Sequence, residues 1–344
     1  MLRNSQSIPA IARRTHQYPP PQHSSSLVER CLMCMLLLAS WFAASVTVMA
    51  LPIHSQQLTT LGQQPDDPLA SAHKLVDEQK YPEAETQVRA YLEGHLLSAE
   101  AHFLLGFILF RENKAKESLA EYTAGARYKS PSAADLKIVA FDYVLIDDYA
   151  DAEKWLIEST QRDPANADSW YSLGRVQYKL NHFQQAITAF ERSLALEPRS
   201  VKSEDNLGLT LAALERNDEA IAAYRTAIAW QAGAEHPSEQ PLLNLGILLL
   251  EHNQLAESAT LLEQAVAIAP TDPKIHEQLG RAYLAQGKLA EAAQHLERAV
   301  ALAPDDSRLH YQLGQVYRRQ GLADKAKAEF ARTEALSGSK STRP

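Results

Sequence analysis

A pattern of small and large residues recurring about every 34 residues constrains this chain more than any other feature. It returns eight times, with a small residue at its eighth and twentieth positions and a bulky residue at its twenty-fourth. The eighth positions hold Ala72, Gly106, Ala140, Gly174, Gly208, Gly246, Gly280 and Gly314. The twentieth positions hold Ala84, Ser118, Ala152, Ala186, Ala220, Ser258, Ala292 and Ala326, and the twenty-fourth hold Val88, Tyr122, Leu156, Phe190, Tyr224, Leu262, Leu296 and Phe330. Two small columns let two helices approach closely, and the bulky column fills the space beside them. We therefore expect Ala186 to lie opposite Gly174 where two helices cross.

Each copy has the apolar spacing of a helical hairpin. In residues 167–200, apolar side chains recur three or four positions apart, which is typical of helices and not of strands. Prolines mark the ends of four copies, because proline stops a helix and sets the following turn: Pro164, Pro198, Pro270 and Pro304. One hairpin cannot bury its apolar stripe alone, so the copies are expected to stack around a shared core.

With these residues in view, the chain resembles the tetratricopeptide repeat family, whose pattern is W-x2-L-G-x2-Y, A-x3-F and P. Trp170, Leu173, Gly174, Ala186 and Phe190 fit it, although Gln177 stands where tyrosine is usual. The resemblance implies an all-α, right-handed superhelical solenoid of about eight helix-turn-helix repeats. The repeats would be 65–98, 99–132, 133–166, 167–200, 201–234, 239–272, 273–306 and 307–340, followed by a tail at 341–344. Residues 235–238 interrupt the period and predict a longer turn.

The beginning of the chain has a different composition. Residues 1–30 are proline-rich and serine-rich with few apolar groups, and predict a disordered basic tail. Residues 31–50 contain no charged residue and end in Val48-Met49-Ala50, which is typical of a signal peptide cleaved after Ala50. An uncleaved membrane anchor is the alternative, because the run approaches the ~20 apolar residues that span a bilayer. Residues 51–64 would be a linker.

Both interpretations place the repeats outside the cytoplasm. They would be periplasmic or secreted after cleavage, or attached to the inner membrane by the anchor. The translation start is left open between Met1 and a position near Val28, because the basic stretch is long for a signal peptide.

Charge and composition exclude several function classes. The chain carries a net charge of −8; residues 1–50 hold four arginines and one glutamate, or +3, so the remainder is −8 − 3 = −11. An acidic surface repels phosphate backbones, which argues against nucleic acid as a partner. Both cysteines, Cys31 and Cys34, precede the repeats, so the repeats can form no disulfide. The sequence has no catalytic motif, metal-ligand spacing or cofactor motif, and we expect a protein that is not an enzyme and needs no cofactor.

The resemblance also implies a concave groove lined by the first helix of each repeat. Its sixth position holds a hydroxyl or an amide in five successive copies: Ser172, Asn206, Asn244, Gln278 and Gln312. Such groups can hydrogen-bond an extended peptide backbone, although a plain solvated surface explains the column equally well. Aromatic residues gather instead on the N-terminal half of the groove: Phe103, Phe107, Phe110, Phe141, Tyr171 and Tyr178. The stretch 102–110 is apolar on every side, which predicts that something covers it.

These observations favour an exported or membrane-anchored, non-catalytic scaffold that binds a protein or peptide segment in its groove and assembles or organises the cell envelope. A substrate-presenting subunit of an envelope enzyme complex, acting on glycans or peptidoglycan, is the alternative. Self-association into a homodimer is the third. Nothing in the residues identifies the partner, the pathway or the oligomeric state.

Overall fold

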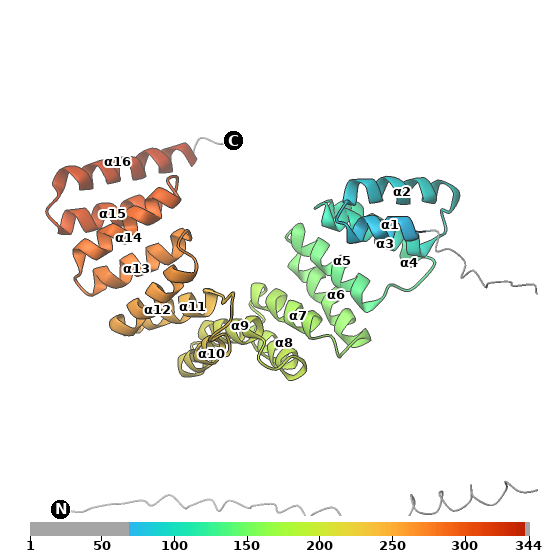
Figure 1. The fold of residues 1–344 in the computed structure, drawn as a ribbon, viewed down its shortest axis with the longest axis horizontal. Coiled ribbons are helices and arrows are strands. Elements are labelled where there is room, and N and C mark those ends of the chain that lie inside the picture. Colours follow the sequence, from blue (N-terminus) through green and yellow to red (C-terminus); the bar gives the residue numbers. More distant parts are fainter. Residues whose placement is uncertain (1–68, 341–344) are drawn as a thin grey trace, which may run out of the picture. The chain divides into compact units, whose positions relative to one another are not determined.

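The computed structural model describes residues 69–340, and this part of the chain consists of sixteen α-helices and no strands (Figure 1). The basic tail, the hydrophobic run and the linker expected at 1–64 lie outside the described residues, as does the C-terminal tail expected at 341–344. None of the helices that the structure describes is long and apolar enough to cross a membrane.

The helices form consecutive hairpins, two helices to each repeat. The hairpins are α1 (Ala70–Asp77) with α2 (Tyr81–Gly94), α3 (Ala99–Arg111) with α4 (Ala115–Ala126), α5 (Ala133–Leu145) with α6 (Tyr149–Arg162), α7 (Ala167–Lys179) with α8 (Phe183–Leu196), α9 (Val201–Ala213) with α10 (Asn217–Trp230), α11 (Gln240–Glu251) with α12 (Leu255–Ile268), α13 (Pro273–Ala285) with α14 (Leu289–Leu302), and α15 (Ser307–Arg319) with α16 (Ala323–Lys340). Each second helix also contacts the first helix of the following repeat, and several first helices contact one another, as α3 does α5 and α9 does α11. The expected all-α solenoid is confirmed.

The small eighth position and the bulky twenty-fourth position of each repeat pack directly against each other. A Cβ atom added to Gly174 would lie 2.6 Å from Cε1 of Phe190, and one added to Gly208 would lie 2.8 Å from Cε1 of Tyr224. The Phe190 ring therefore fills the space beside Gly174, as expected of the bulky column. The twentieth residue also lies opposite the eighth in equivalent repeats, since a Cβ added to Gly246 or Gly280 would lie 3.5 or 3.3 Å from the carbonyl oxygen of Ser258 or Ala292. The twentieth position lies nearer the backbone of the first helix, as the hydroxyl of Ser118 donates to the carbonyl oxygen of Gly106 at 2.8 Å.

The turn inside each hairpin contains one residue with left-handed backbone geometry. All eight have φ between 58° and 78° and stand at the fifteenth position: Gln79, Asn113, Asp147, Asn181, Glu215, Asn253, Gly287 and Gly321. Asparagine, aspartate and glycine adopt this conformation most readily, and they account for six of the eight. These residues end each first helix at the same place, so the second helix always begins in the same register.

The interruption at 235–238 forms an ordered connection between α10 and α11. The buried side chain of Gln231 donates from Nε2 to the carbonyl of Ser238 at 2.7 Å and accepts from the Ser238 amide at 2.9 Å. Gly233, at φ 80°, allows the chain to reverse there. One amide side chain therefore closes the extra residues into a loop without opening the core.

Candidate protein-binding groove

A pocket of about 320 Å³ lies on the first-helix side of the third, fourth and fifth repeats. We call it the central pocket. Its walls come from α5, the start of α6, α7 and α9, and are formed by Phe141, Val144, Tyr149, Ser172, Arg175, Val176, Tyr178, Lys179, Asn206 and Leu209. Four of these were among the predicted groove residues: Phe141, Ser172, Tyr178 and Asn206. Three consecutive repeats therefore contribute to one cavity.

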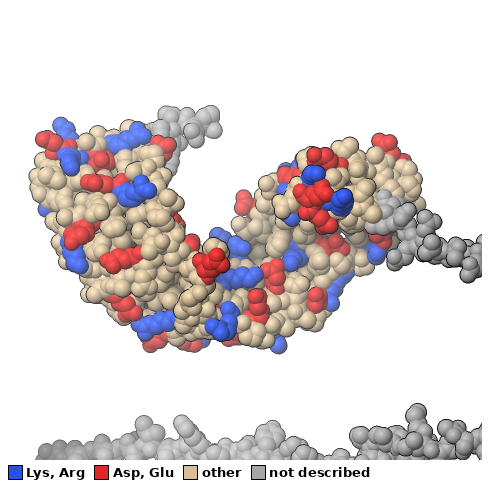
Figure 2. Space-filling view, in the orientation of Figure 1, with Lys and Arg blue, Asp and Glu red and all other residues tan. Residues whose placement is uncertain are grey.

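The central pocket contains two cations and no carboxylate. Arg175 and Lys179 stand four residues apart on α7, so they lie on the same side of the helix, and both are exposed. Neither has an ion-pair partner within residues 69–340; the guanidinium of Arg175 lies 5.8 Å from the ring centre of Tyr171. Acidic and basic side chains are interspersed over the visible surface of the repeats (Figure 2). A cavity with only positive charge is thus a local departure from an acidic chain.

A further cluster of charge lies beside the pocket, around Asp168. Its carboxylate accepts from Nζ of Lys137 and from Nζ of Lys202, both at 3.0 Å. Burial alone would raise the pKa of Asp168, but the hydrogen bonds from the two lysines outweigh it and the pKa lies below its usual value. Lys202 also lies 4.6 Å above the ring of Tyr171. One negative charge shared by two lysines leaves this neighbourhood positive as well.

The predicted aromatic residues do not form a single surface. Phe141 and Tyr178 line the central pocket, and Phe110 stacks on Phe141 with ring centres 6.1 Å apart, which extends the apolar wall toward α3. Phe107 is half-buried beneath the guanidinium of Arg111. Phe103 instead packs between α3 and α4, against Gly125, so it contributes to the core more than to the groove.

Neighbouring helices supply most of the cover that the apolar stretch 102–110 was expected to need. Leu104, Leu105, Ile108 and Leu109 are buried among α2, α4 and α5. The phenylalanines of this stretch remain half-buried. A separate partner is therefore not required to cover α3.

The predicted column of amides is largely engaged inside the protein. Asn244 donates from Nδ2 to both carboxylate oxygens of Asp205, at 2.9 and 3.2 Å. Gln312 donates in the same way to Glu277, at 2.8 Å. In each case the sixth position of one repeat reaches the acidic fifth position of the preceding repeat, which ties consecutive first helices together. Burial raises the pKa of Asp205 to about 6, although the Asn244 hydrogen bond lowers it.

The other members of this column bond within their own helices. Ser172 is buried and donates to the carbonyl of Asp168, and the Asn206 amide donates to the carbonyl of Lys202, both at 2.8 Å. Gln278 accepts from Arg281 at 2.6 Å. Of the five, Ser172 and Asn206 lie at the central pocket. The arrangement does not form a continuous row of free amides.

Ring nitrogens at the fourth position of four repeats make a shared contact that the sequence did not reveal. The Trp170 Nε1 hydrogen donates to the carbonyl of Pro164 at 3.0 Å, and Nε2 of His102, His276 and His310 lies 2.9 to 3.1 Å from the carbonyl six residues earlier. In His102 and His310 the other nitrogen faces a glutamate, Glu121 or Glu329, at 2.6 Å. In the seventh repeat that partner is replaced by His295, whose Nδ1 lies 3.1 Å from Nδ1 of His276. The alignment that revealed the glycine columns would also have revealed this one.

A buried carboxylate joins the second and third repeats. Asp142 on α5 is fully buried, with Oδ2 2.5 Å from the Ser118 hydroxyl and with Oδ1 lacking any hydrogen bond among the described residues. Burial raises the pKa of Asp142 to about 7, against the hydrogen bond from Ser118, which lowers it. Since the Ser118 hydroxyl has one hydrogen and also contacts Gly106, a proton on Asp142 would complete this chain of hydrogen bonds.

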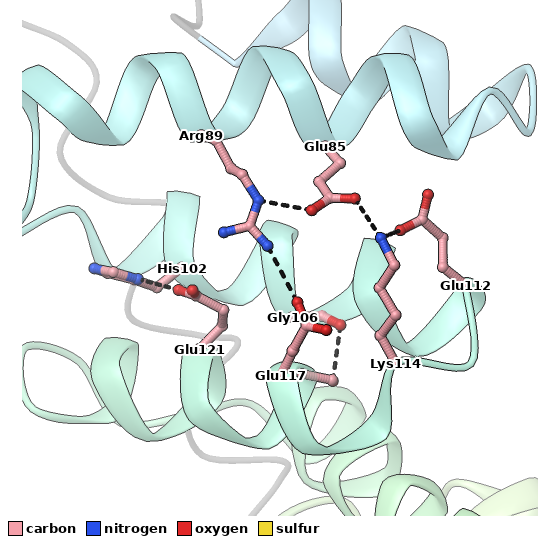
Figure 3. Close-up of polar contacts among 9 residues, drawn as sticks. Glu85, Arg89, His102, Gly106, Glu112, Lys114, Glu117 and Glu121 are labelled. Carbon is pink, nitrogen blue, oxygen red and sulfur yellow. Dashed lines mark hydrogen bonds and ion pairs between the residues drawn. The ribbon is translucent and has the colours of Figure 1, made fainter.

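An ion-pair network joins the first and second repeats (Figure 3). Glu85 on α2 accepts from Arg89 at 2.6 Å and from Lys114 at 2.8 Å, and Lys114 also contacts Glu112 at 2.8 Å. The hydrogen bond from Lys114 is the main reason that the pKa of Glu85 falls to about 2. These groups hold two repeats together and lie apart from the central pocket.

The described residues contain no group of three or more histidine, cysteine, aspartate or glutamate side chains able to hold a metal ion. The polar clusters described above link helices or repeats. The first-helix face with the central pocket is the candidate site.

Comparison with known sequences decides the family. Five segments match profiles described as TPR repeat or tetratricopeptide repeat, at residues 69–134, 167–200, 200–271, 261–294 and 280–321. The chain belongs to the tetratricopeptide repeat family. Proteins of this family are generally non-catalytic scaffolds, and the fold is one of protein interaction.

One curated relative, anaphase-promoting complex subunit 6 of Arabidopsis thaliana, is 26% identical over 115 residues, which are 33% of this chain and 20% of that protein. The chain thus matches about a fifth of the length of this relative.

Solved structures share the fold. A tetratricopeptide repeat protein from Parabacteroides merdae superposes with a TM-score of 0.58 at 17% identity, covering 72% of this chain and 96% of that one. PilW, described as a widely conserved type IV pilus biogenesis factor, superposes with a TM-score of 0.54 at 20% identity, covering 59% of this chain and 92% of its own. At these identities the likeness concerns the architecture.

Proposed function

We propose that this tetratricopeptide repeat protein is a non-catalytic scaffold of the cell envelope that holds a segment of a partner protein against its first-helix face. The observation that carries the proposal is the central pocket, in which Phe141, Tyr178 and Leu209 from three successive repeats surround one cavity. Concave sites with mostly apolar walls and a few polar groups are where proteins bind ligands. An extended segment can cross several repeats and contact each in turn.

The place of action is proposed from the uncharged run at 31–50. Export would leave the repeats outside the cytoplasm, either free after cleavage behind Ala50 or attached through the retained run. PilW, described as a type IV pilus biogenesis factor, shares the fold at 20% identity. The envelope part of the proposal therefore depends on the N-terminal sequence.

Two measurements test the proposal. Cell fractionation with N-terminal sequencing should recover either a chain beginning at Leu51 in the soluble envelope fraction or the longer chain in membranes; a full-length chain in the soluble cytoplasm would overturn the location. Affinity capture from native envelopes should recover a partner protein with wild type and lose it when Phe141 and Tyr178 are both replaced by alanine. Enzyme activity that co-purifies would favour the alternative, a substrate-presenting subunit of an envelope enzyme complex.

A further inference from the structure

The central pocket combines apolar walls with positive charge that no residue between 69 and 340 neutralises. Its cations, Arg175 and Lys179, are exposed, four residues apart, and unpaired within the described part of the chain. Beside them the apolar wall is formed by Phe141, Val144, Tyr178 and Leu209. An occupant that fits must offer an apolar side chain to the wall and a carboxylate to the cations.

The carboxylates near the central pocket are not available to neutralise Arg175 and Lys179. Asp168, the nearest carboxylate of α7, is already shared by Lys137 and Lys202, so it cannot also neutralise Arg175 and Lys179. Glu204 and Asp205 on α9 are partly or fully buried and do not line the pocket, and the Asp205 carboxylate accepts hydrogen bonds from Asn244. The first-helix face at repeats three to five is thus positive on a chain whose net charge is −8. A positive electrostatic potential at this face attracts negatively charged ligands and orients them.

The chain itself does not supply such a segment near its N-terminus. Residues 1–64 contain one acidic residue, Glu29, against four arginines. The acidic pair Asp66 and Asp67 directly precedes Leu69, whose side chain is already buried in the core of the first two repeats. Charge complementarity therefore points away from self-occupation and toward another molecule.

We infer that the central pocket binds an acidic segment of a partner protein, one that places an aliphatic or aromatic side chain next to one or two carboxylates. Arg175 and Lys179 would contact the carboxylates, and Tyr178 and Phe141 would enclose the apolar side chain. This inference rests on the proposed function and adds the chemistry of the partner. Binding would weaken as salt is raised, because the cations are exposed to solvent.

Selection from a random peptide library on the immobilised full chain tests the inference without a known partner. Selected peptides should be rich in aspartate and glutamate next to leucine, phenylalanine or tyrosine. Fluorescence anisotropy should then show binding at least about tenfold weaker to the Arg175→Glu/Lys179→Glu double variant. A version of the peptide with amides in place of its carboxylates should lose affinity to a similar degree.

Arg192→Glu is the matched control. Arg192 belongs to α8 of the same repeat, is exposed, and has no ion-pair partner among residues 69–340. It does not line the pocket, so reversing its charge should leave peptide affinity within about twofold of wild type. Thermal melting of all variants should coincide, because none of these side chains supports the core.

Several results would overturn the inference. Selected peptides without acidic bias, or equal binding by wild type and the double variant, would contradict it. If such peptides still required Phe141 and Tyr178, the proposed groove would stand while the acidic partner would not. A dimer of the full chain that an acidic peptide dissociates, measured by sedimentation, would assign the pocket to a second copy instead of a foreign segment.

Discussion

The ring of Phe190 occupies the space where a side chain on Gly174 would begin: an added Cβ would lie 2.6 Å from Cε1 and 2.8 Å from Cδ1. The same relationship joins Gly314 to Phe330, at 2.7 Å. In the third repeat the pair is Ala140 with Leu156, both fully buried. The third repeat thus holds a Cβ at the eighth position beside a leucine, whereas in the sixth and seventh repeats a Cβ added to Gly246 or Gly280 would lie 2.8 Å from Cγ of Leu262 or Leu296.

We predict that Gly174→Ala lowers the free energy of unfolding by about 1–3 kcal/mol, because the buried Phe190 ring must shift. Chemical denaturation measures the change. Gly94→Ala serves as the control, since an added Cβ there meets no atom within 4 Å, and it should leave stability unchanged or slightly higher. The double variant Gly174→Ala/Phe190→Leu reproduces the third repeat and should lose about 1 kcal/mol less than the sum of the two single variants. Strict additivity would contradict the packing described here.

Much of this architecture was predictable from the sequence, because small and bulky residues at fixed intervals can belong only to closely packed helices. The sequence did not show which atoms approach each glycine most closely. The Phe190 ring is nearest to Gly174, and this depends on the crossing geometry of the two helices. The orientation of an aromatic ring depends on packing from a third helix, and the sequence of a single repeat does not determine that packing.

Asn244 and Asn206 provide a second test, since they occupy equivalent positions but have different partners. Asn244→Ala should destabilise the protein by about 1–3 kcal/mol, because it leaves the buried Asp205 carboxylate without the amide that it accepts from. Asn206→Ala removes only a contact to its own helix backbone and should change stability by less than about 0.5 kcal/mol. Urea denaturation of both variants decides this. Equal effects would show that the link between repeats has no energetic role.

Asp142 predicts a dependence of stability on pH. Its folded pKa of about 7 lies above the ordinary value of 3.8, so the folded chain holds the proton more tightly than the unfolded chain. Its contribution to stability is therefore fully present below pH 3.8 and is lost as the pH rises to about 7. We expect Asp142→Asn to lessen the fall in stability between about pH 5 and about pH 8. The comparison of wild type with this variant isolates Asp142, and identical pH profiles would contradict the assignment.

The paired histidines of the seventh repeat predict a dependence of the opposite sign. Burial, followed by the charge of His276, lowers the pKa of His295 below its ordinary value of 6.5, so the folded chain resists protonation. Stability from this site is present above pH 6.5 and is lost as the pH falls below it. His295→Gln should reduce the loss of stability between about pH 7 and about pH 5, as followed by thermal melting. A steeper loss in the variant would contradict this interpretation.

The candidate groove was predictable in part, and the limits have physical causes. Phe141, Tyr178 and Asn206 meet at the central pocket, as their positions on first helices indicated. Asn244 and Gln312 were expected to be free, but acidic residues of the preceding repeats accept their hydrogens. Contacts of this kind join residues more than 30 positions apart, and they depend on how far each repeat rotates against the next. The repeat period of the sequence indicates that the repeats stack. It does not determine the angle by which each repeat is rotated against the next.

Photocrosslinking in the cells that make this protein tests most directly whether the first-helix face binds a partner. A photoreactive amino acid would replace Tyr178 in the central pocket or, as a control, Arg192 on α8. We predict that illumination yields a discrete covalent complex with one partner protein from position 178 and none from position 192, and that Arg175→Glu/Lys179→Glu abolishes it. Complexes formed only from position 192, or none from position 178 while the protein remains folded, would contradict the binding of a partner in this groove.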